Sequence, residues 1–252
     1  MKVLNLILAS NGTAYSAFET QWTRYMHSCP QVESYFYKAR QDLKTPYELS
    51  GNTLWIQMPD TMATVYAKTV KALAFFRPRF AEFDFILRPN MSSLFVFDRY
   101  LTYLATLPPN RCIEGVFVHS YGYTYPSGCG FTITPDVAEL LITSTSAQYH
   151  MDDVTVGKIA HENGIKVKLR GFLCVEPDTV STAITKLKTA PGLFHLRFKT
   201  DNRQRDSEAY SAIVDSIMSG EVRAAVSQRL DQPSASQPAQ PPEQPPRPPT
   251  PL

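Results

Sequence analysis

The sequence contains few cysteines, and none of them stands in a metal-binding or redox motif. Cys29, Cys112, Cys129 and Cys174 lie far apart in a chain of 252 residues, with no C-x-x-C pair and no zinc spacing. This pattern argues against a zinc ribbon and a thioredoxin-type redox centre. It predicts free thiols in a reducing compartment, with a Cys112–Cys129 bridge as the alternative.

The chain also has no excess of charge of either sign and no long apolar run. Its 25 basic and 23 acidic residues give a net charge of +2, which indicates neither a nucleic-acid surface nor an anionic membrane partner. The opening MKVLNLILAS is short for the apolar region of a signal peptide, and no later stretch is long enough to span a bilayer. We therefore expect a soluble, cytoplasmic protein without a transmembrane segment.

Both common glycine-rich nucleotide fingerprints are missing. The sequence contains no G-x-G-x-x-G and no G-x-x-x-x-G-K-[ST], so neither the dinucleotide-binding fingerprint nor the P-loop is present. The first predicted strand is followed by neither a glycine-rich loop nor a D-x-D-x motif, which argues against a methyltransferase or a phosphatase. An unrelated α/β nucleotide-binding enzyme stays an alternative, because alternating strands and helices occur in many such enzymes.

Composition divides the chain near residue 230. Residues 231–252, DQPSASQPAQPPEQPPRPPTPL, hold 9 of the 20 prolines and no aromatic residue, so they cannot bury enough apolar surface to fold. We expect a disordered, polyproline-like tail that acts as a linker or tether, with a ligand for an SH3-type domain as the alternative. The folded domain then covers residues 1–230.

Within residues 1–230, predicted strands alternate with predicted helices. Apolar runs that predict strands occupy 3–10, 34–39, 53–58, 83–88, 112–119 and 131–135, and two later runs lie at 165–172 and 193–199. Patterns that predict helices occupy 14–28, 59–77, 93–107, 135–146 and 154–163. This alternation predicts a single α/β domain, a three-layer sandwich around a mainly parallel sheet.

Three stretches resemble, in order and spacing, the fringe-like β-glycosyltransferases of glycosyltransferase family 31 and related microbial and viral enzymes. They read FDFILRPNMSSLFVFDRYL, YPSGCGFTITPDVAELL and MDDVTVGKIAHENGIKV, and Ala67-Lys68-Thr69 extends the match upstream. The resemblance covers residues 50–170, and more weakly 3–10 and 193–206. It implies a GT-A fold and the transfer of a sugar from a nucleotide-diphosphate donor.

The adjacent carboxylates of Asp152 and Asp153 have two explanations. Aspartate is favoured at a helix N-cap and in the first turn, but a helix over 154–163 that ends before Gly164 needs only one of them. The resemblance implies that Asp153 deprotonates the acceptor hydroxyl, while Asp152 caps the helix or holds the acceptor. A base on the face opposite the leaving diphosphate gives inversion at the anomeric carbon.

The chain has Asn90-Met91-Ser92 where the family has an acidic triplet that holds a metal. Asn and Ser oxygens are weak ligands for the Mn²⁺ or Mg²⁺ ion of a diphosphate, so a divalent metal is in doubt. Two alternatives stay open: the diphosphate and one distant ligand hold the metal, or Lys68 and Arg88 neutralise the diphosphate directly. Asn90 and Ser92 are expected at the donor site, at a strand-to-helix turn with Ser as the N-cap.

A late segment, LFHLRFKTDNRQRD at 193–206, adds further candidates. His195, Arg197 and Lys199 alternate, so a strand places them on one face, which suits a diphosphate or its metal. The resemblance implies a metal-binding histidine late in the domain, and His195 is the positional candidate. An exposed basic edge strand is the alternative.

The remaining candidates lie in or beside loops at the ends of predicted strands. Ser10 and Asn11 end the first strand, where GT-A enzymes hold the nucleotide base and ribose. Gly128 and Gly130 let the backbone approach an acceptor sugar closely, because neither has a Cβ. Tyr125 either stacks on an acceptor ring or packs within an edge strand.

The function predicted from these residues and the resemblance is that of an inverting glycosyltransferase, a hexosyl- or pentosyltransferase. Its donor is a nucleotide-diphosphate sugar, of UDP-sugar type, and its acceptor is a hydroxyl of a glycan. A catalytically inactive sugar- or nucleotide-binding member of the same fold is the alternative, which the missing acidic triplet favours.

Overall fold

The computed structural model of the chain describes residues 1–145 and 151–222. The predicted tail at 231–252 and the predicted domain boundary at 230 lie outside these residues. The four cysteines are free thiols, as predicted, and Cys112 and Cys129 are not bridged. No helix in the described part of the chain combines the length and the apolar character needed to cross a membrane.

An eight-stranded sheet forms the centre of the domain, in the order β3-β4-β2-β1-β5-β8-β7-β9. The pairs β1–β2, β1–β5, β2–β4 and β7–β9 are parallel, and the other three neighbouring pairs are antiparallel. In chain order its strands are β1 (Val3–Leu8), β2 (Val32–Ala39), β3 (Tyr47–Ser50), β4 (Thr53–Ile56), β5 (Phe85–Pro89), β7 (Ile113–Ser120), β8 (Tyr123–Ile133) and β9 (Val167–Leu169).

A second, three-stranded sheet, seven α-helices and four short 3-10 helices complete the described fold. The small sheet consists of β6 (Ser93–Phe95), β10 (Leu173–Cys174) and β11 (His195–Arg197), with β11 in the middle. The helices are α1 (Ser16–Tyr25), α2 (Val65–Phe76), α3 (Phe97–Leu104), α4 (Pro135–Thr143), α5 (Asp152–Glu162), α6 (Val180–Thr189) and α7 (Arg203–Met218).

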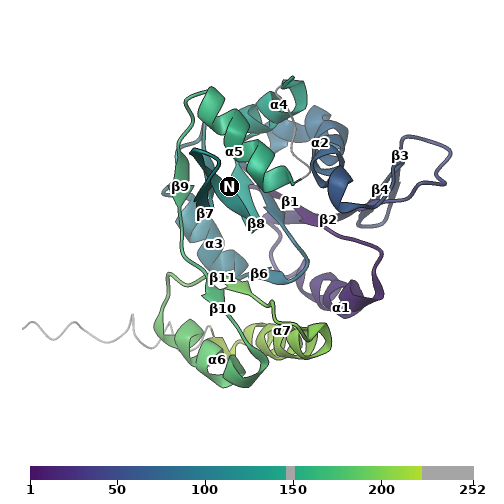
Figure 1. The fold of residues 1–252 in the computed structure, drawn as a ribbon. Coiled ribbons are helices and arrows are strands. Elements are labelled where there is room, and N and C mark those ends of the chain that lie inside the picture. Colours follow the sequence, from purple (N-terminus) through teal and green to yellow (C-terminus); the bar gives the residue numbers. More distant parts are fainter. Residues whose placement is uncertain (146–150, 223–252) are drawn as a thin grey trace, which may run out of the picture.

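The large sheet separates two apolar cores, because alternate residues of its central strand point to opposite faces. Val3 and Ile7 of β1 pack in the core that also contains residues of α1, α3, α6 and α7. Leu4 and Leu6 pack in the other core, with residues of α2, α4 and α5. Figure 1 shows α2, α4 and α5 together on one side and α1, α6 and α7 beside the small sheet on the other. The predicted α/β three-layer fold is confirmed.

Three local predictions differ from the structure. The predicted helix at 93–107 begins with β6, and its helical part α3 has Val96 as N-cap, so the prediction of a serine N-cap was wrong. β6 pairs with β11, about a hundred residues further along the chain, a contact that local pattern cannot reveal. The predicted strand at 131–135 is the end of the much longer β8, and α6 and α7 were not predicted.

Candidate active site

A cavity of about 700 Å³ lies beyond the carboxyl ends of β1 and β5. This is the position at which open α/β sheets bind ligands, because the loops after the strands diverge there. Its walls come from the ends of β1 and β5, from α2, from β8, from the start of α5, and from the small sheet with Lys199. The predicted residues that line it are Ser10, Lys68, Arg88, Asn90, Ser92, Gly128, Asp152, Asp153, Arg197 and Lys199.

The wall of the cavity contains a buried ion pair between Arg88 and Asp152. Their side chains are only 4% and 3% exposed, and Arg88 Nη2 lies 2.6 Å from Asp152 Oδ2. The same oxygen accepts a hydrogen bond from Thr69 Oγ1, whose own partner is the hydroxyl of Tyr37. Burial is the largest single influence and lowers the pKa of Arg88, but Asp152, Tyr37 and Asp153 together raise it more, so the net shift is upward. The carboxylate of Asp152 is therefore already bound by Arg88 and Thr69.

Asp153 is held in a different way, by backbone donors rather than by a cation. Gly128 N donates to Oδ2 at 2.7 Å, and Val154 N donates to Oδ1 at 2.8 Å. A Cβ at position 128 would lie 2.8 Å from Oδ2, so a larger residue there would displace the carboxylate of Asp153. Burial and the neighbouring charge of Asp152 raise the pKa of Asp153 above that of an ordinary aspartate. A carboxylate with a raised pKa, at a cavity and without a cationic partner in direct contact among the described residues, is well suited to accept a proton.

Lys68 fixes the turn that follows β1. Its Nζ is buried, donates to the carbonyl of Ala9 at 3.0 Å and lies 2.7 Å from Asp60 Oδ1. The other oxygen of Asp60 accepts the backbone N–H of Asn11 at 3.2 Å. Sequence reasoning missed Asp60, although the Pro59-Asp60 pair before the helix was a signal for a capping carboxylate near the strand end. The side chain of Asn11 bonds to the carbonyl of Ala39, on β2, rather than to the cavity.

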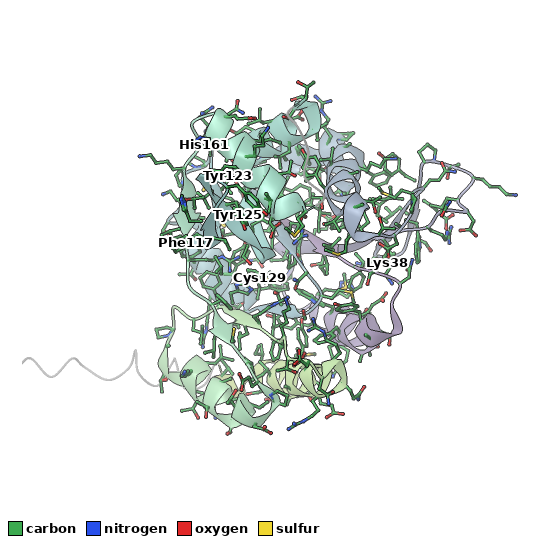
Figure 2. All side chains as sticks on the ribbon, in the orientation of Figure 1. Lys38, Phe117, Tyr123, Tyr125, Cys129 and His161 are labelled. Atoms are coloured by element: carbon green, nitrogen blue, oxygen red, sulfur yellow. The ribbon has the colours of Figure 1, made fainter. Side chains whose placement is uncertain are left out.

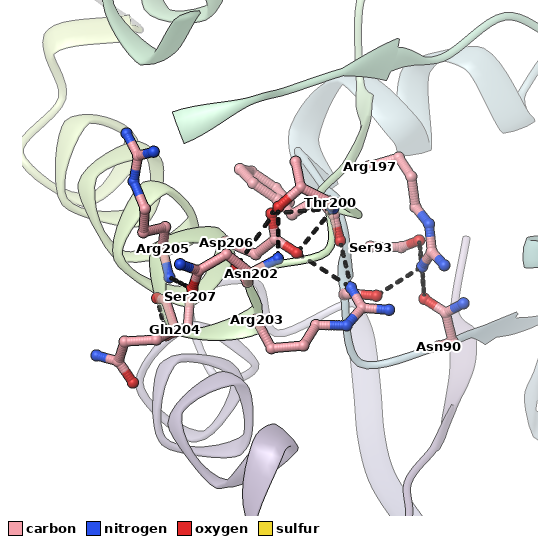
Figure 3. Close-up of polar contacts among 12 residues, drawn as sticks. Asn90, Ser93, Arg197, Thr200, Asn202, Arg203, Gln204, Arg205, Asp206 and Ser207 are labelled. Atoms are coloured by element: carbon pink, nitrogen blue, oxygen red, sulfur yellow. Dashed lines mark hydrogen bonds and ion pairs between the residues drawn. The ribbon is translucent and has the colours of Figure 1, made fainter. Parts of the chain in front are cut away.

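Arg197 of the small sheet reaches the segment that stands in place of the family's acidic triplet. Its Nη1 donates to Asn90 Oδ1, to Ser92 Oγ at 2.8 Å and to Ser93 Oγ at 3.3 Å (Figure 3). Burial lowers the pKa of Arg197, and the positive charges of Arg203 and Arg88 lower it further. Lys199, two residues on, is exposed at the rim of the same cavity.

His195 does not line the cavity, although it shares its side of β11 with Arg197: His195 pairs with Phe95 of β6 and Arg197 pairs with Ser93. Its ring stacks on Phe95 with centroids 4.4 Å apart, and its Nδ1 bonds to Arg170, which pairs with the buried Glu114. Its Nε2 is buried and has no hydrogen-bond partner among the residues that the structure describes. The alternative prediction of an exposed basic edge strand was wrong, because β11 is flanked on both sides in the small sheet. Glu114 and Arg170 were not predicted.

Tyr125 and Gly130, predicted at the acceptor, serve packing contacts in the structure. Tyr123 and Tyr125 lie beside α5 with His161 (Figure 2), and a Cβ added at Gly157 of α5 would lie 2.0 Å from the Cβ of Tyr125. The carbonyl of Gly130 accepts a hydrogen bond from Arg170 at 2.7 Å. Neither residue lines the cavity.

The donor groups at the cavity do not fit a divalent metal. Of the three carboxylates that line the cavity, Asp60 and Asp152 are paired with cations, and Asp153 accepts two backbone N–H groups. The side-chain oxygens of Asn90 and Ser92 accept hydrogen bonds from Arg197. Within residues 1–145 and 151–222, no group of three or more His, Cys, Asp or Glu side chains is placed to hold a metal ion. Mn²⁺ and Mg²⁺ require anionic or carbonyl oxygens that are free to coordinate, and His195 offers none to this cavity.

Similarity to known proteins comes from the fold rather than from the sequence. No protein-family model matches the chain, and no curated protein sequence does. The structure is similar to that of a glycosyltransferase involved in the glycosylation of the major capsid of PBCV-1, with 10% identity and a TM-score of 0.50 over 83% of this chain and 100% of that chain. It is also similar to the apo-form glycosyltransferase GlyE from Streptococcus pneumoniae TIGR4, with 13% identity and a TM-score of 0.44 over 88% of this chain and 64% of that chain. The first likeness shows that the chain has a glycosyltransferase fold.

Proposed function

We propose that the protein is an inverting glycosyltransferase that moves a sugar from a nucleotide-diphosphate donor, of UDP-sugar type, to a hydroxyl of a glycan acceptor. The observation that carries the proposal is Asp153, a partly buried carboxylate with a raised pKa at a cavity that also contains four cationic side chains. The fold supports the proposal, because it is similar to that of a glycosyltransferase involved in the glycosylation of the PBCV-1 major capsid.

In this reaction Asp153 acts as general base. Its carboxylate accepts the proton of the acceptor hydroxyl while the acceptor oxygen attacks the anomeric carbon of the donor sugar. The bond from that carbon to the diphosphate oxygen breaks in the same step, so the nucleoside diphosphate leaves and the configuration inverts. Gly128 N and Val154 N hold the carboxylate in place without neutralising it. Asp152 positions Asp153 through the hydrogen bond from Asp153 N to Asp152 Oδ1 at 2.9 Å.

The donor is assigned to the part of the cavity that lies between β1 and the small sheet. Ser10, with Asn11 beside it in the turn that Lys68 fixes, is proposed to contact the nucleoside. The cationic side of the cavity, with Arg197 and Lys199, is proposed to face the diphosphate, because guanidinium and ammonium groups form charge-assisted hydrogen bonds to phosphate oxygens. Asn90 and Ser92 contribute by holding Arg197.

The test is the replacement of Asp153 by asparagine. The donor is first chosen as the nucleotide-sugar that raises the melting temperature of the wild type most. Asp153→Asn is expected to keep the melting temperature and the donor affinity, and to lose about two to four orders of magnitude in single-turnover transfer with saturating donor. The matched control is Asp136→Asn, which changes an exposed aspartate in the first turn of α4 and is expected to leave transfer unchanged.

Two results distinguish the alternatives. Near-wild-type transfer by Asp153→Asn would leave the aspartate with a structural role only. The inactive sugar- or nucleotide-binding alternative is favoured by the absence of the acidic triplet, and it predicts binding without turnover. Slow hydrolysis of the chosen nucleotide-sugar by the wild type, without any acceptor, excludes that alternative.

A further inference from the structure

The charges that line the cavity fall into paired and unpaired groups. Lys68 is neutralised by Asp60 at 2.7 Å, and Arg88 by Asp152 at 2.6 Å. Arg197 has no ion pair with a carboxylate in residues 1–145 and 151–222. The two cations first expected to meet a diphosphate are thus already compensated, whereas Arg197 is not.

Arg197 is held rigidly by neutral oxygens. Its three hydrogen bonds to Asn90, Ser92 and Ser93 all use Nη1, so its Nε and Nη2 donors make no hydrogen bond to the described residues. A partly buried cation surrounded by neutral groups is unfavourable unless an anion compensates it. Three polar side chains and the sheet position of β11 fix the guanidinium without supplying that anion.

The same contacts explain why a divalent ion does not fit here. The oxygens of Asn90 and Ser92 stand where the resemblance places the metal-holding triplet, and both are occupied by a guanidinium. A second positive charge beside Arg197 would be repelled, and the carboxylates of Asp60 and Asp152 at this cavity are already paired with Lys68 and Arg88.

We propose that Arg197 takes the place of the metal: its fixed guanidinium neutralises the diphosphate of the donor, and the site binds diphosphates without a divalent cation. The free edge of the guanidinium forms a two-point contact with phosphate oxygens, which a planar fork does better than an ammonium group. Lys199 adds a second, solvent-exposed positive charge at the rim. That this diphosphate belongs to a sugar donor rests on the proposed function. That Arg197 binds a diphosphate does not.

Calorimetry with inorganic pyrophosphate and the full-length protein tests this inference. Pyrophosphate is expected to bind in EDTA, and Arg197→Met is expected to weaken it about 10- to 100-fold, the loss of a charge-assisted pair. Arg205→Met is the control, because it removes the same charge from an exposed residue of α7 that pairs with Asp178. Its affinity is expected to match the wild type.

The outcomes separate this inference from the proposed function. Pyrophosphate binding that requires Mn²⁺, or an Arg197→Met variant that binds like the wild type, overturns the role of Arg197. If Arg197→Met does not fold, Arg197→Lys is the second test, because it keeps the charge but loses the planar fork of the guanidinium. It is expected to bind pyrophosphate about fivefold more weakly than the wild type. Equal affinity contradicts the proposal. Arg197-dependent binding in EDTA, with no turnover of any nucleotide-sugar, leaves the anion site standing and overturns the transferase.

Discussion

Replacing Asp152 by asparagine tests whether this carboxylate belongs to the framework of the site rather than to its chemistry. The change removes the only carboxylate paired with Arg88 among the described residues, and both side chains are less than 5% exposed. The new amide group can donate where Asp152 accepted from Arg88 and Thr69. Breaking a buried ion pair from one side costs about 3–5 kcal/mol, because the remaining charge stays buried and uncompensated.

The expected result is a large loss of stability. For a domain of this size each kcal/mol lowers the melting temperature by about 2–4 °C, so Asp152→Asn is expected to lower it by about 6–20 °C. The control is Asp215→Asn, which breaks an exposed pair with Arg24 and is expected to cost at most about 1 kcal/mol. Differential scanning calorimetry of the two variants gives the comparison.

A double variant separates the loss of the pair from the loss of packing. Asp152→Leu combined with Arg88→Met removes both charges, and it is expected to be more stable than Asp152→Leu alone. A fall of less than about 2 °C for Asp152→Asn would refute the reasoning, because it would mean that Arg88 is neutralised by solvent or by another group. A double variant less stable than the single one would refute it too.

Two further predictions concern the elements that support the site. Gly157→Ala places a Cβ 2.0 Å from that of Tyr125, so α5 must move away from β8. We expect the free energy of unfolding, measured in urea, to fall by at least about 1–3 kcal/mol, and transfer to become slower. Gly171→Ala, with open space around it, should change neither the stability nor the transfer rate. Burial and the charge of Arg170 hold the pKa of His195 well below its ordinary value, so below about pH 6.5 the unfolded chain binds a proton that the folded chain does not. The free energy of unfolding should therefore fall by up to about 1.4 kcal/mol per pH unit from this group as the pH drops from 7 to 5, and an unchanged slope in His195→Gln would contradict this.

Local sequence pattern predicted most of the central fold, because its strands are buried apolar runs with turn residues at their ends. The runs at 3–10, 53–58 and 112–119 became β1, β4 and β7. Pattern failed where an element depends on a distant partner. β6 is a strand only because Leu94 faces Leu196 of β11, and its sequence otherwise continues the helical pattern of α3.

The candidate site shows the same division. The rule that ligands lie beyond the carboxyl ends of strands predicted Arg88 and the two aspartates near one site, and the resemblance added Lys68; all four residues line the cavity. The sequence could not predict which of these charges are already paired. Arg88 and Asp152, for example, lie more than 60 positions apart, and their pairing depends on the three-dimensional arrangement of their side chains. The contact of Arg197 with Asn90 joins residues 107 positions apart. His195 shares its side of β11 with Arg197, but its ring is buried against Phe95 and Phe172, contacts with distant residues that alternation along one strand cannot reveal.

The backbone of Gly128 links the framework of the cavity to the proposed base. Its carbonyl accepts hydrogen bonds from Arg88 Nη1 at 2.7 Å and from Asn90 Nδ2 at 3.1 Å, while its N–H donates to Asp153. Arg88 thus orients Asp153 through Gly128, besides compensating Asp152. A protein that only binds a nucleotide-sugar needs a compensating cation for the diphosphate, whereas the proposed transfer also needs a proton acceptor such as Asp153, whose pKa burial and Asp152 raise. In the proposed transferase, the second buried carboxylate next to Asp152 has a role as the acceptor of the hydroxyl proton.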